Sequence, residues 1–159
     1  MSKTPTSPQS PQICLPPPLT FVWHHAGATP LGGNDKTRSE FCQIVISCIE
    51  FSNEVQCLNY IIKNESEHFV LIVFTESSKF LADIQQLEQV KFLYVLSNDT
   101  ITKRNVVKTG GVFASEKDLL VHLSNDIIYH YTQEENRRIE EYQQARKLCD
   151  FVKGLLANN

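Results

Sequence analysis

From Leu19 onward, short apolar runs alternate with segments in which apolar residues recur at every third or fourth position. An uninterrupted apolar run is typical of a strand covered on both faces, whereas the longer period is typical of a helix with one buried side. The pattern predicts strands at residues 19–23, 48–52, 68–75, 90–96 and 112–114.

Helices are predicted in the segments that separate and follow these strands, at residues 36–47, 53–64, 78–87, 100–107 and 116–131. Three of them are preceded by side chains that can accept hydrogen bonds from the first backbone N–H groups of a helix. These caps are Asn53, Ser77 or Ser78, and Ser115. In the helix at 53–64, Val55, Leu58, Ile61 and Ile62 repeat at helical spacing.

The alternation of strands and helices decides the predicted fold class. Parallel strands joined through helices use right-handed crossovers, which place helices on both faces of the sheet. The sequence therefore predicts an α/β fold with a doubly wound, five-stranded parallel sheet in the order 2-1-3-4-5.

The beginning of the chain differs in composition from the rest. All seven prolines lie between Pro5 and Pro30, and Lys3 is the only charged side chain before Asp35. Because proline fixes φ and removes a hydrogen-bond donor, residues 1–19 are predicted to form a disordered, proline-rich leader. We expect the folded domain at 20–131 and a helical tail at 132–159.

The tail follows a wholly polar interruption at residues 133–138. Apolar residues three or four positions apart then predict an amphipathic helix. Its stripe either folds back on the domain or binds a protein partner or a second copy of the chain. The candidate partner-binding residues are Ile139, Tyr142, Leu148, Val152 and Leu155.

Charge and composition exclude several classes of partner. The 159 residues carry a formal net charge of −3, which gives no basic surface for phosphates, so we expect no nucleic acid. The longest purely apolar run, at residues 69–74, is too short to cross a bilayer, so we expect no membrane association. The five cysteines are widely spaced, and we expect Cys42, Cys48 and Cys57 to be reduced, buried thiols in a cytoplasmic protein.

In a sheet of this kind, ligands bind beyond the carboxyl ends of the strands. The polar side chains predicted there are His24, His25, Thr75, Glu76, Ser77, Ser78, Ser97, Asn98, Asp99 and Ser115. Loops and helix caps also need such residues, so this rim has two interpretations. It is either a structural edge or the cleft of an enzyme that processes a nucleotide such as NAD, with His25, Glu76 and Ser78 near the chemistry.

Familiar catalytic and cofactor motifs are missing from the sequence. The segment after the first strand lacks the G-x-G-x-x-G of a dinucleotide site, and Gly32–Gly33 is not followed by the G-K-[ST] of a P-loop. The adjacent His24 and His25 point to opposite sides of an extended chain, so they do not share a metal. We therefore predict no metal, no cofactor and no catalytic residue.

Four patterned segments resemble a known family. They are residues 51–61, 69–75, 84–95 and 108–113. They are similar to a receiver-like, flavodoxin-like α/β module that precedes tetratricopeptide arrays or arginine-specific ADP-ribosyltransferase domains in invertebrate multidomain proteins. The resemblance covers about residues 20–130. It implies a module that has no catalytic residues of its own.

Two enzymatic relatives of this topology fit less well. A phosphoacceptor receiver needs an aspartate after the third strand, where this chain has Thr75 and Glu76. A TIR-type NAD hydrolase uses a glutamate in the next helix, and Glu88 lies near the end of that helix without the accompanying serine and tryptophan-cysteine pattern. We therefore expect a non-catalytic protein-interaction or regulatory module.

Overall fold

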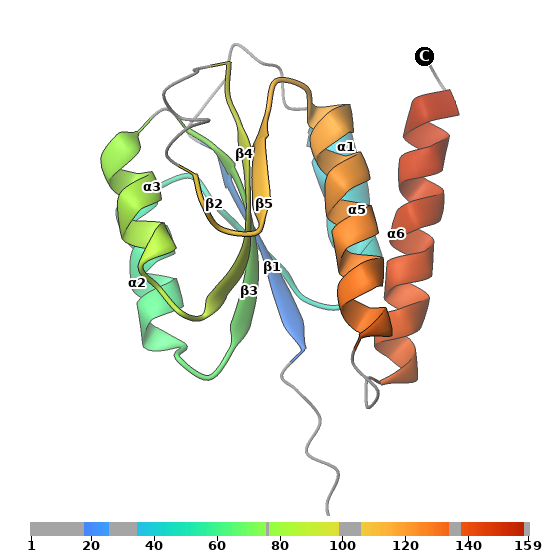
Figure 1. Cartoon of the computed structure of the whole chain (residues 1–159), viewed down its shortest axis with the longest axis horizontal. Helices are drawn as coiled ribbons and strands as arrows, with labels where there is room; N and C mark the ends of the chain where they lie inside the picture. Colours follow the sequence, from blue (N-terminus) through green and yellow to red (C-terminus); the bar gives the residue numbers. More distant parts are fainter. Residues whose placement is uncertain (1–17, 26–34, 76, 99–105, 134–137, 158–159) are drawn as a thin grey trace, which may run out of the picture.

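The centre of the molecule is a parallel sheet with the strand order β2-β1-β3-β4-β5 (Figure 1). The computed structural model describes residues 18–25, 35–75, 77–98, 106–133 and 138–157. The strands are β1 (Leu19–His25), β2 (Cys48–Phe51), β3 (His68–Phe74), β4 (Val90–Leu96) and β5 (Gly110–Phe113). The predicted α/β fold and strand order are confirmed.

Helices cover both faces of this sheet. In Figure 1, α2 and α3 lie on one side, and α1 and α5 lie on the other. The bounds are α1 (Asp35–Ile44), α2 (Glu54–Lys63), α3 (Ser78–Gln85), α5 (Glu116–Thr132) and α6 (Ile139–Ala157). The helix predicted at 100–107 and the predicted leader fall almost entirely outside the described residues.

The central strand β3 shows why its apolar run is uninterrupted. Val70 and Ile72 face the core formed with α1 and α5, while Leu71 and Val73 face the core formed with α2 and α3. All four side chains are fully buried. Because successive side chains of a strand point to opposite faces, burial on both faces requires apolar residues at every position.

Helix starts follow the predicted caps. Asn53, Ser77 and Ser115 each accept a hydrogen bond from the backbone N–H three residues later, at 3.0, 3.3 and 3.3 Å. The choice that the sequence left open between Ser77 and Ser78 is resolved in favour of Ser77.

The buried side of α2 includes only part of the apolar repeat seen in the sequence. Val55 is 65% exposed and Ile62 is 48% exposed, whereas Cys57 and Ile61 are fully buried. Both pairs are spaced for one side of a helix, so the apolar pattern alone did not choose between them. Packing against the core under α2 and α3 selects the Cys57–Ile61 side, and Val55 and Ile62 remain largely exposed.

The tail helix α6 lies on the side of α1 and α5 that faces away from the sheet (Figure 1). Ala145, Leu148 and Val152 are buried in the same core as α1 and α5. The structure thus shows the fold-back arrangement, in which Leu148 and Val152 are covered by the chain's own helices. Ile139, at the start of α6, is 73% exposed. Among the described residues, no helix is both long enough and apolar enough to cross a membrane.

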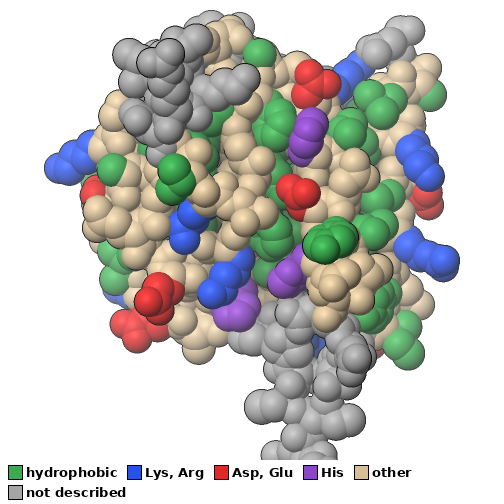
Figure 2. Space-filling model, viewed as in Figure 1, with side chains coloured by type: hydrophobic (Ala, Val, Ile, Leu, Met, Phe, Trp, Pro, Cys, Tyr) green, Lys and Arg blue, Asp and Glu red, His purple; other side chains and the backbone are tan. Residues whose placement is uncertain are grey.

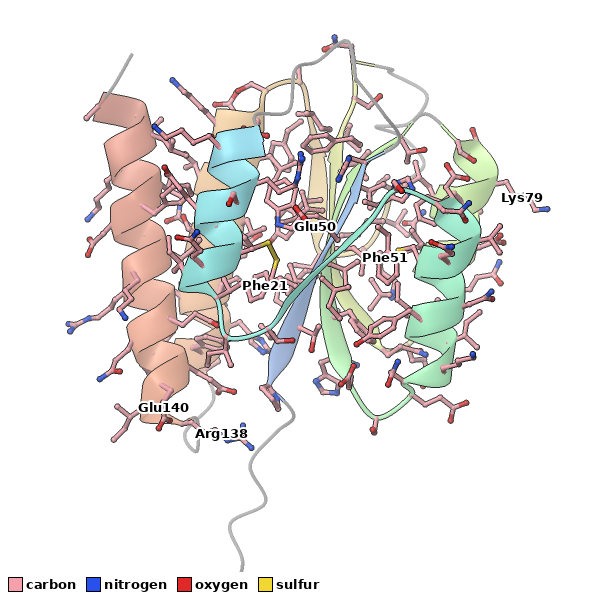
Figure 3. The ribbon with its side chains drawn as sticks, turned by 180° about the vertical axis from the view of Figure 1, so that it is seen from behind. Phe21, Glu50, Phe51, Lys79, Arg138 and Glu140 are labelled. Atoms are coloured by element: carbon pink, nitrogen blue, oxygen red, sulfur yellow. A yellow bond between two sulfur atoms is a disulfide. The ribbon has the colours of Figure 1, made fainter. Side chains whose placement is uncertain are left out.

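A disulfide joins Cys42 at the end of α1 to Cys48 at the start of β2, and Figure 3 shows it as a yellow bond. The expectation of reduced thiols at these two positions was wrong. The turn between α1 and β2 brings their Cα atoms to 5.3 Å, within the range that a disulfide spans. Cys57 and Cys149 are free thiols, and Cys57 is buried as expected.

Candidate functional site

The parallel register brings several predicted rim residues to one edge of the sheet. His24 and His25 end β1 opposite Val73 and Phe74 of β3, and Thr75 follows directly. Ser97 and Asn98 follow β4, and Ser115 follows β5. Glu76 and Asp99 lie outside the described residues.

His24 is fully buried at this edge, on the side that α2 and α3 cover. Its ring lies 4.8 Å from the ring of Phe80, with 44° between the planes. Neither ring nitrogen has a hydrogen-bond partner in the described structure. Burial lowers the pKa of His24, the nearby Glu54 carboxylate partly offsets this, and His25 lowers it further. The ring is therefore held in its neutral form.

The hydroxyl groups beside His24 have structural partners. Thr75 Oγ1 donates to Glu54 Oε1 at 3.1 Å and accepts from the backbone N–H of Ser77 at 3.0 Å. Ser77 Oγ is the cap of α3, and Ser78 is exposed at the first position of that helix. These bonds fix the start of α2 and the start of α3 against the end of β3.

Cys57 lies one turn along α2 from Glu54. Burial, with a smaller contribution from the Glu54 carboxylate, raises the pKa of its thiol to about 12. A nucleophilic cysteine needs a lowered pKa, so this thiol is a packing residue.

The other predicted rim residues serve β4, β5 and α5. The backbone N–H of Ser97 donates to the carbonyl of Phe113 at 2.9 Å, and Ser97 is buried. Ser115 Oγ caps α5. Asn98 is exposed. The Ser115 hydroxyl thus serves the start of α5, away from the hydrogen bonds that join Thr75 to Glu54 and Ser77.

Glu54 is the member of this edge that sequence reasoning missed. It occupies the first position of α2, directly after the Asn53 cap. An acidic residue at that position was visible in the sequence as a favourable charge for a helix start. Its hydrogen bond to Thr75, which lies 21 residues later, follows only from the fold.

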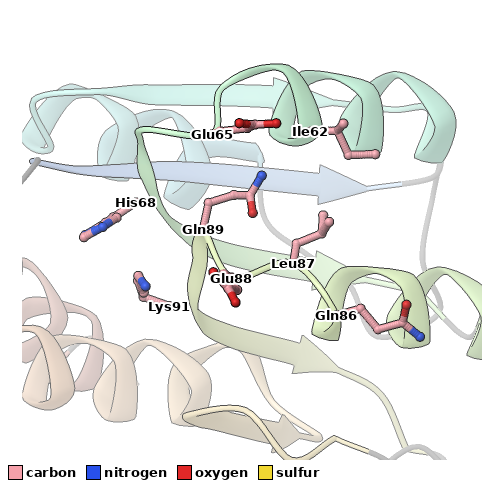
Figure 4. A pocket seen from close by; sticks show the side chains of 8 residues that line it. All are labelled: Ile62, Glu65, His68, Gln86, Leu87, Glu88, Gln89 and Lys91. Atoms are coloured by element: carbon pink, nitrogen blue, oxygen red, sulfur yellow. The ribbon is translucent and has the colours of Figure 1, made fainter.

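A groove of about 610 Å³ lies at the opposite edge of the sheet, beside the first residues of β3 and β4 (Figure 4). Its charged and titratable lining consists of Glu65, Glu88, His68 and Lys91. Gln89, also in the lining, donates from Nε2 to the carbonyl of Ile61 at 3.0 Å. Because acidic and basic side chains are mixed, the lining favours neither an anionic nor a cationic ligand.

A second, smaller hollow of about 250 Å³ lies between the start of β4 and the second half of α5. We call it the Asp126 hollow, and its lining consists of Phe92, Thr109, Asp126, Tyr129, His130 and Gln133. Tyr94 Oη donates to Asp126 Oδ2 at 2.7 Å from inside the core. The sequence analysis did not single out any of these residues.

Metal ligation finds no support in the described ranges, where no three histidine, cysteine or acidic side chains gather around a common point. Comparisons with known proteins returned nothing: no family model, no curated protein and no solved structure matches the chain. The fold and the geometry of these sites therefore carry the functional argument.

Proposed function

We propose that this chain is a non-catalytic protein-interaction or regulatory α/β module. The resemblance noted in the sequence suggests a stand-alone version of the module that precedes ADP-ribosyltransferase or tetratricopeptide domains in other proteins. A cytoplasmic location is part of the proposal, as the sequence predicts. The proposal of a non-catalytic module is supported by the carboxyl edge of the sheet, where enzymes of this topology have their active sites.

One observation carries the proposal: the hydroxyl of Thr75 donates to Glu54 while the ring of His24 is buried against Phe80. A nucleophilic hydroxyl needs a base within hydrogen-bond reach that is in turn held by a third group. The hydroxyls of Thr75, Ser77 and Ser115 bond to Glu54 or to backbone N–H groups, and neither nitrogen of His24 has a hydrogen-bond partner in the described structure. These side chains join helices to strands instead.

Apolar side chains on the outside of the helices offer surface for a partner. Val55 and Ile62 lie seven residues apart on α2, so they project from the same side of that helix. At the tail, Ile139 is exposed, and Tyr142 and Leu155 are half-buried. A protein partner or a second copy of the chain would contact these positions rather than Leu148 and Val152, which are buried.

A specific observation also favours a second candidate, a nucleotide-processing enzyme. Both nitrogens of His24 are buried without a partner at the edge where this fold binds ligands. A buried polar group in that state calls for an explanation, and a bound ligand is one.

Thermal unfolding of the purified chain with and without NAD separates the two candidates. A module without a nucleotide site keeps the same Tm at millimolar NAD. A saturable rise in Tm that His24→Leu abolishes would instead favour the enzyme. His122→Leu is the matched control, since it removes an exposed imidazole from α5 and leaves the histidines of this edge in place.

A further inference from the structure

The carboxylate of Asp126 lies where α5 packs on the sheet and accepts a hydrogen bond from a tyrosine of β4. Tyr94, fully buried in the core, donates its hydroxyl to Asp126 Oδ2. Burial and this hydrogen bond raise the pKa of Tyr94, so the phenol stays protonated and remains a donor. Among the described residues, no lysine or arginine forms a salt bridge with Asp126.

A lysine next to the hollow in the sequence has its ammonium group bound elsewhere. Lys108 precedes Thr109 of the hollow, but its Nζ donates to the carbonyls of Leu87 at 3.0 Å and Val90 at 2.7 Å. Within the described structure, the carboxylate of Asp126 is thus hydrogen-bonded to a neutral phenol and forms no salt bridge with a lysine or arginine.

Aromatic rings surround the same hollow. The rings of Phe92 and His130 meet edge to face, with centroids 5.4 Å apart and 85° between the planes. Tyr129, which also lines the hollow, is 68% exposed. In Figure 2, acidic, histidine and hydrophobic side chains are interleaved on the side of the molecule where α5 runs.

Rings and a carboxylate around one hollow attract cations. The face of an aromatic ring carries partial negative charge, and a carboxylate forms strong hydrogen bonds with ammonium and guanidinium groups. We propose that the Asp126 hollow binds the cationic end of a lysine or arginine side chain from a protein partner. This inference rests on the proposed interaction function and names the chemistry of the partner.

The size and position of the hollow favour a side chain over a free nucleotide or cofactor. Its volume of about 250 Å³ is below the range of ~300–1,000 Å³ that is typical of sites for whole small molecules. The pairing of β4 with β5 begins at Leu93 and Gly110. Phe92, which lines the hollow, precedes this pair, so β5 does not cover the edge of β4 at that position. The negative net charge of the chain also favours a basic partner.

The test is an amide-resolved NMR titration of the full chain with short peptides that differ at one position, carrying lysine, arginine or acetyl-lysine between glycine and serine residues. We expect saturable shifts at Thr109, Asp126 and Tyr129 with the lysine and arginine peptides and none with the acetyl-lysine peptide. Asp126→Asn weakens binding by about tenfold or more, while Asp150→Asn, which removes an exposed charge from α6, leaves it unchanged.

A second variant keeps the test decisive if Asp126→Asn disturbs the contact with Tyr94. Tyr129→Ala removes an exposed ring and should weaken binding by at least about threefold without loss of fold. Equal binding of the acetyl-lysine peptide, or no shifts at the hollow with any peptide, overturns the inference. Tetramethylammonium that binds as tightly as the lysine peptide overturns the assignment to a protein partner.

Failure here is distinguishable from failure of the proposed function. Turnover of NAD by the same sample would overturn the module proposal whatever the peptides do. If the peptides do not bind and NAD is not consumed, only the assignment of this hollow fails.

Discussion

The side-chain amide oxygen of Gln144 on α6 accepts a hydrogen bond from the backbone N–H of Ile46, which lies 98 residues earlier in the turn between α1 and β2. The amide nitrogen of the same side chain donates to the hydroxyl of Tyr131 on α5 at 3.2 Å. One buried amide therefore ties the tail helix to α5 and to the turn that follows α1. Apolar packing of Leu148 and Val152 completes this attachment.

Replacing that amide should destabilise the protein. Gln144→Ala leaves a backbone N–H and a phenol oxygen without their partner, and we expect a loss of about 1–3 kcal/mol in the free energy of unfolding. Gln143→Ala is the control, because Gln143 is exposed on the same helix and its loss should change stability by less than ~0.5 kcal/mol. Equal urea midpoints for the two variants would contradict the anchoring role.

Removal of the whole tail should unfold or strongly destabilise the domain. Deleting residues 138–159 exposes the surface that Ala145, Leu148 and Val152 cover, and we expect a loss of about 3 kcal/mol or more. Ile139→Ser tests a partner role without this damage, since the side chain is mostly exposed and stability should change by under ~0.5 kcal/mol. A truncated chain with an unchanged Tm would show that α6 is not part of the core.

Among the described glycines, Gly110 tolerates a side chain least. Its φ is +132°, and a Cβ built there would lie 2.1 Å from the carbonyl oxygen of Leu93 in the neighbouring strand. Gly110→Ala should therefore cost about 3 kcal/mol or more. Gly154→Ala is the opposite case, since that Cβ would meet nothing within 4 Å on α6, and we expect a gain of ~0.5–1 kcal/mol. Thermal unfolding of both variants measures the contrast.

The pH dependence of stability should contain a contribution from His24. Because the pKa of His24 is lowered in the folded state, the unfolded chain takes up a proton first as the pH falls. The free energy of unfolding should decrease from near pH 6.5, the ordinary histidine value, and the loss should stop below the folded pKa.

Replacing His24 with an apolar residue of similar volume isolates this contribution. His24→Leu should raise stability at pH 7 by about 1 kcal/mol, because no hydrogen bond is lost, and should flatten the decrease in stability toward pH 5. His25→Leu should keep that decrease but make it smaller, because the neighbouring imidazole also lowers the pKa of His24. A His24→Leu protein that is less stable than the parent at pH 7 would mean that its ring nitrogens have a partner.

Local signals in the sequence were sufficient for much of the fold. The caps Asn53, Ser77 and Ser115 act on N–H groups three residues away, so the sequence contains all that determines them. The side of α2 that is buried was not determined in this way, because Val55 and Ile62 are spaced as well for packing as Cys57 and Ile61. The buried side of α2 is determined by the core on which the helix packs.

The candidate sites depended even more on the fold. Asp126 is an ordinary acidic residue of a helix until Tyr94, 32 residues earlier, is placed beneath it by the packing of α5 on β4. The Cys42–Cys48 disulfide likewise depends on a turn that sequence spacing does not specify. The strand-end residues were identifiable, yet their partners, such as Glu54 for Thr75, were not.

The most direct test of the central claim is the release of nicotinamide when the purified full chain is incubated with NAD. A module whose edge residues serve as caps and helix–strand links should release no more nicotinamide than buffer alone over many hours. Release in proportion to protein concentration, lost in His24→Leu and kept in His122→Leu, would contradict the account and establish chemistry at the carboxyl edge of the sheet.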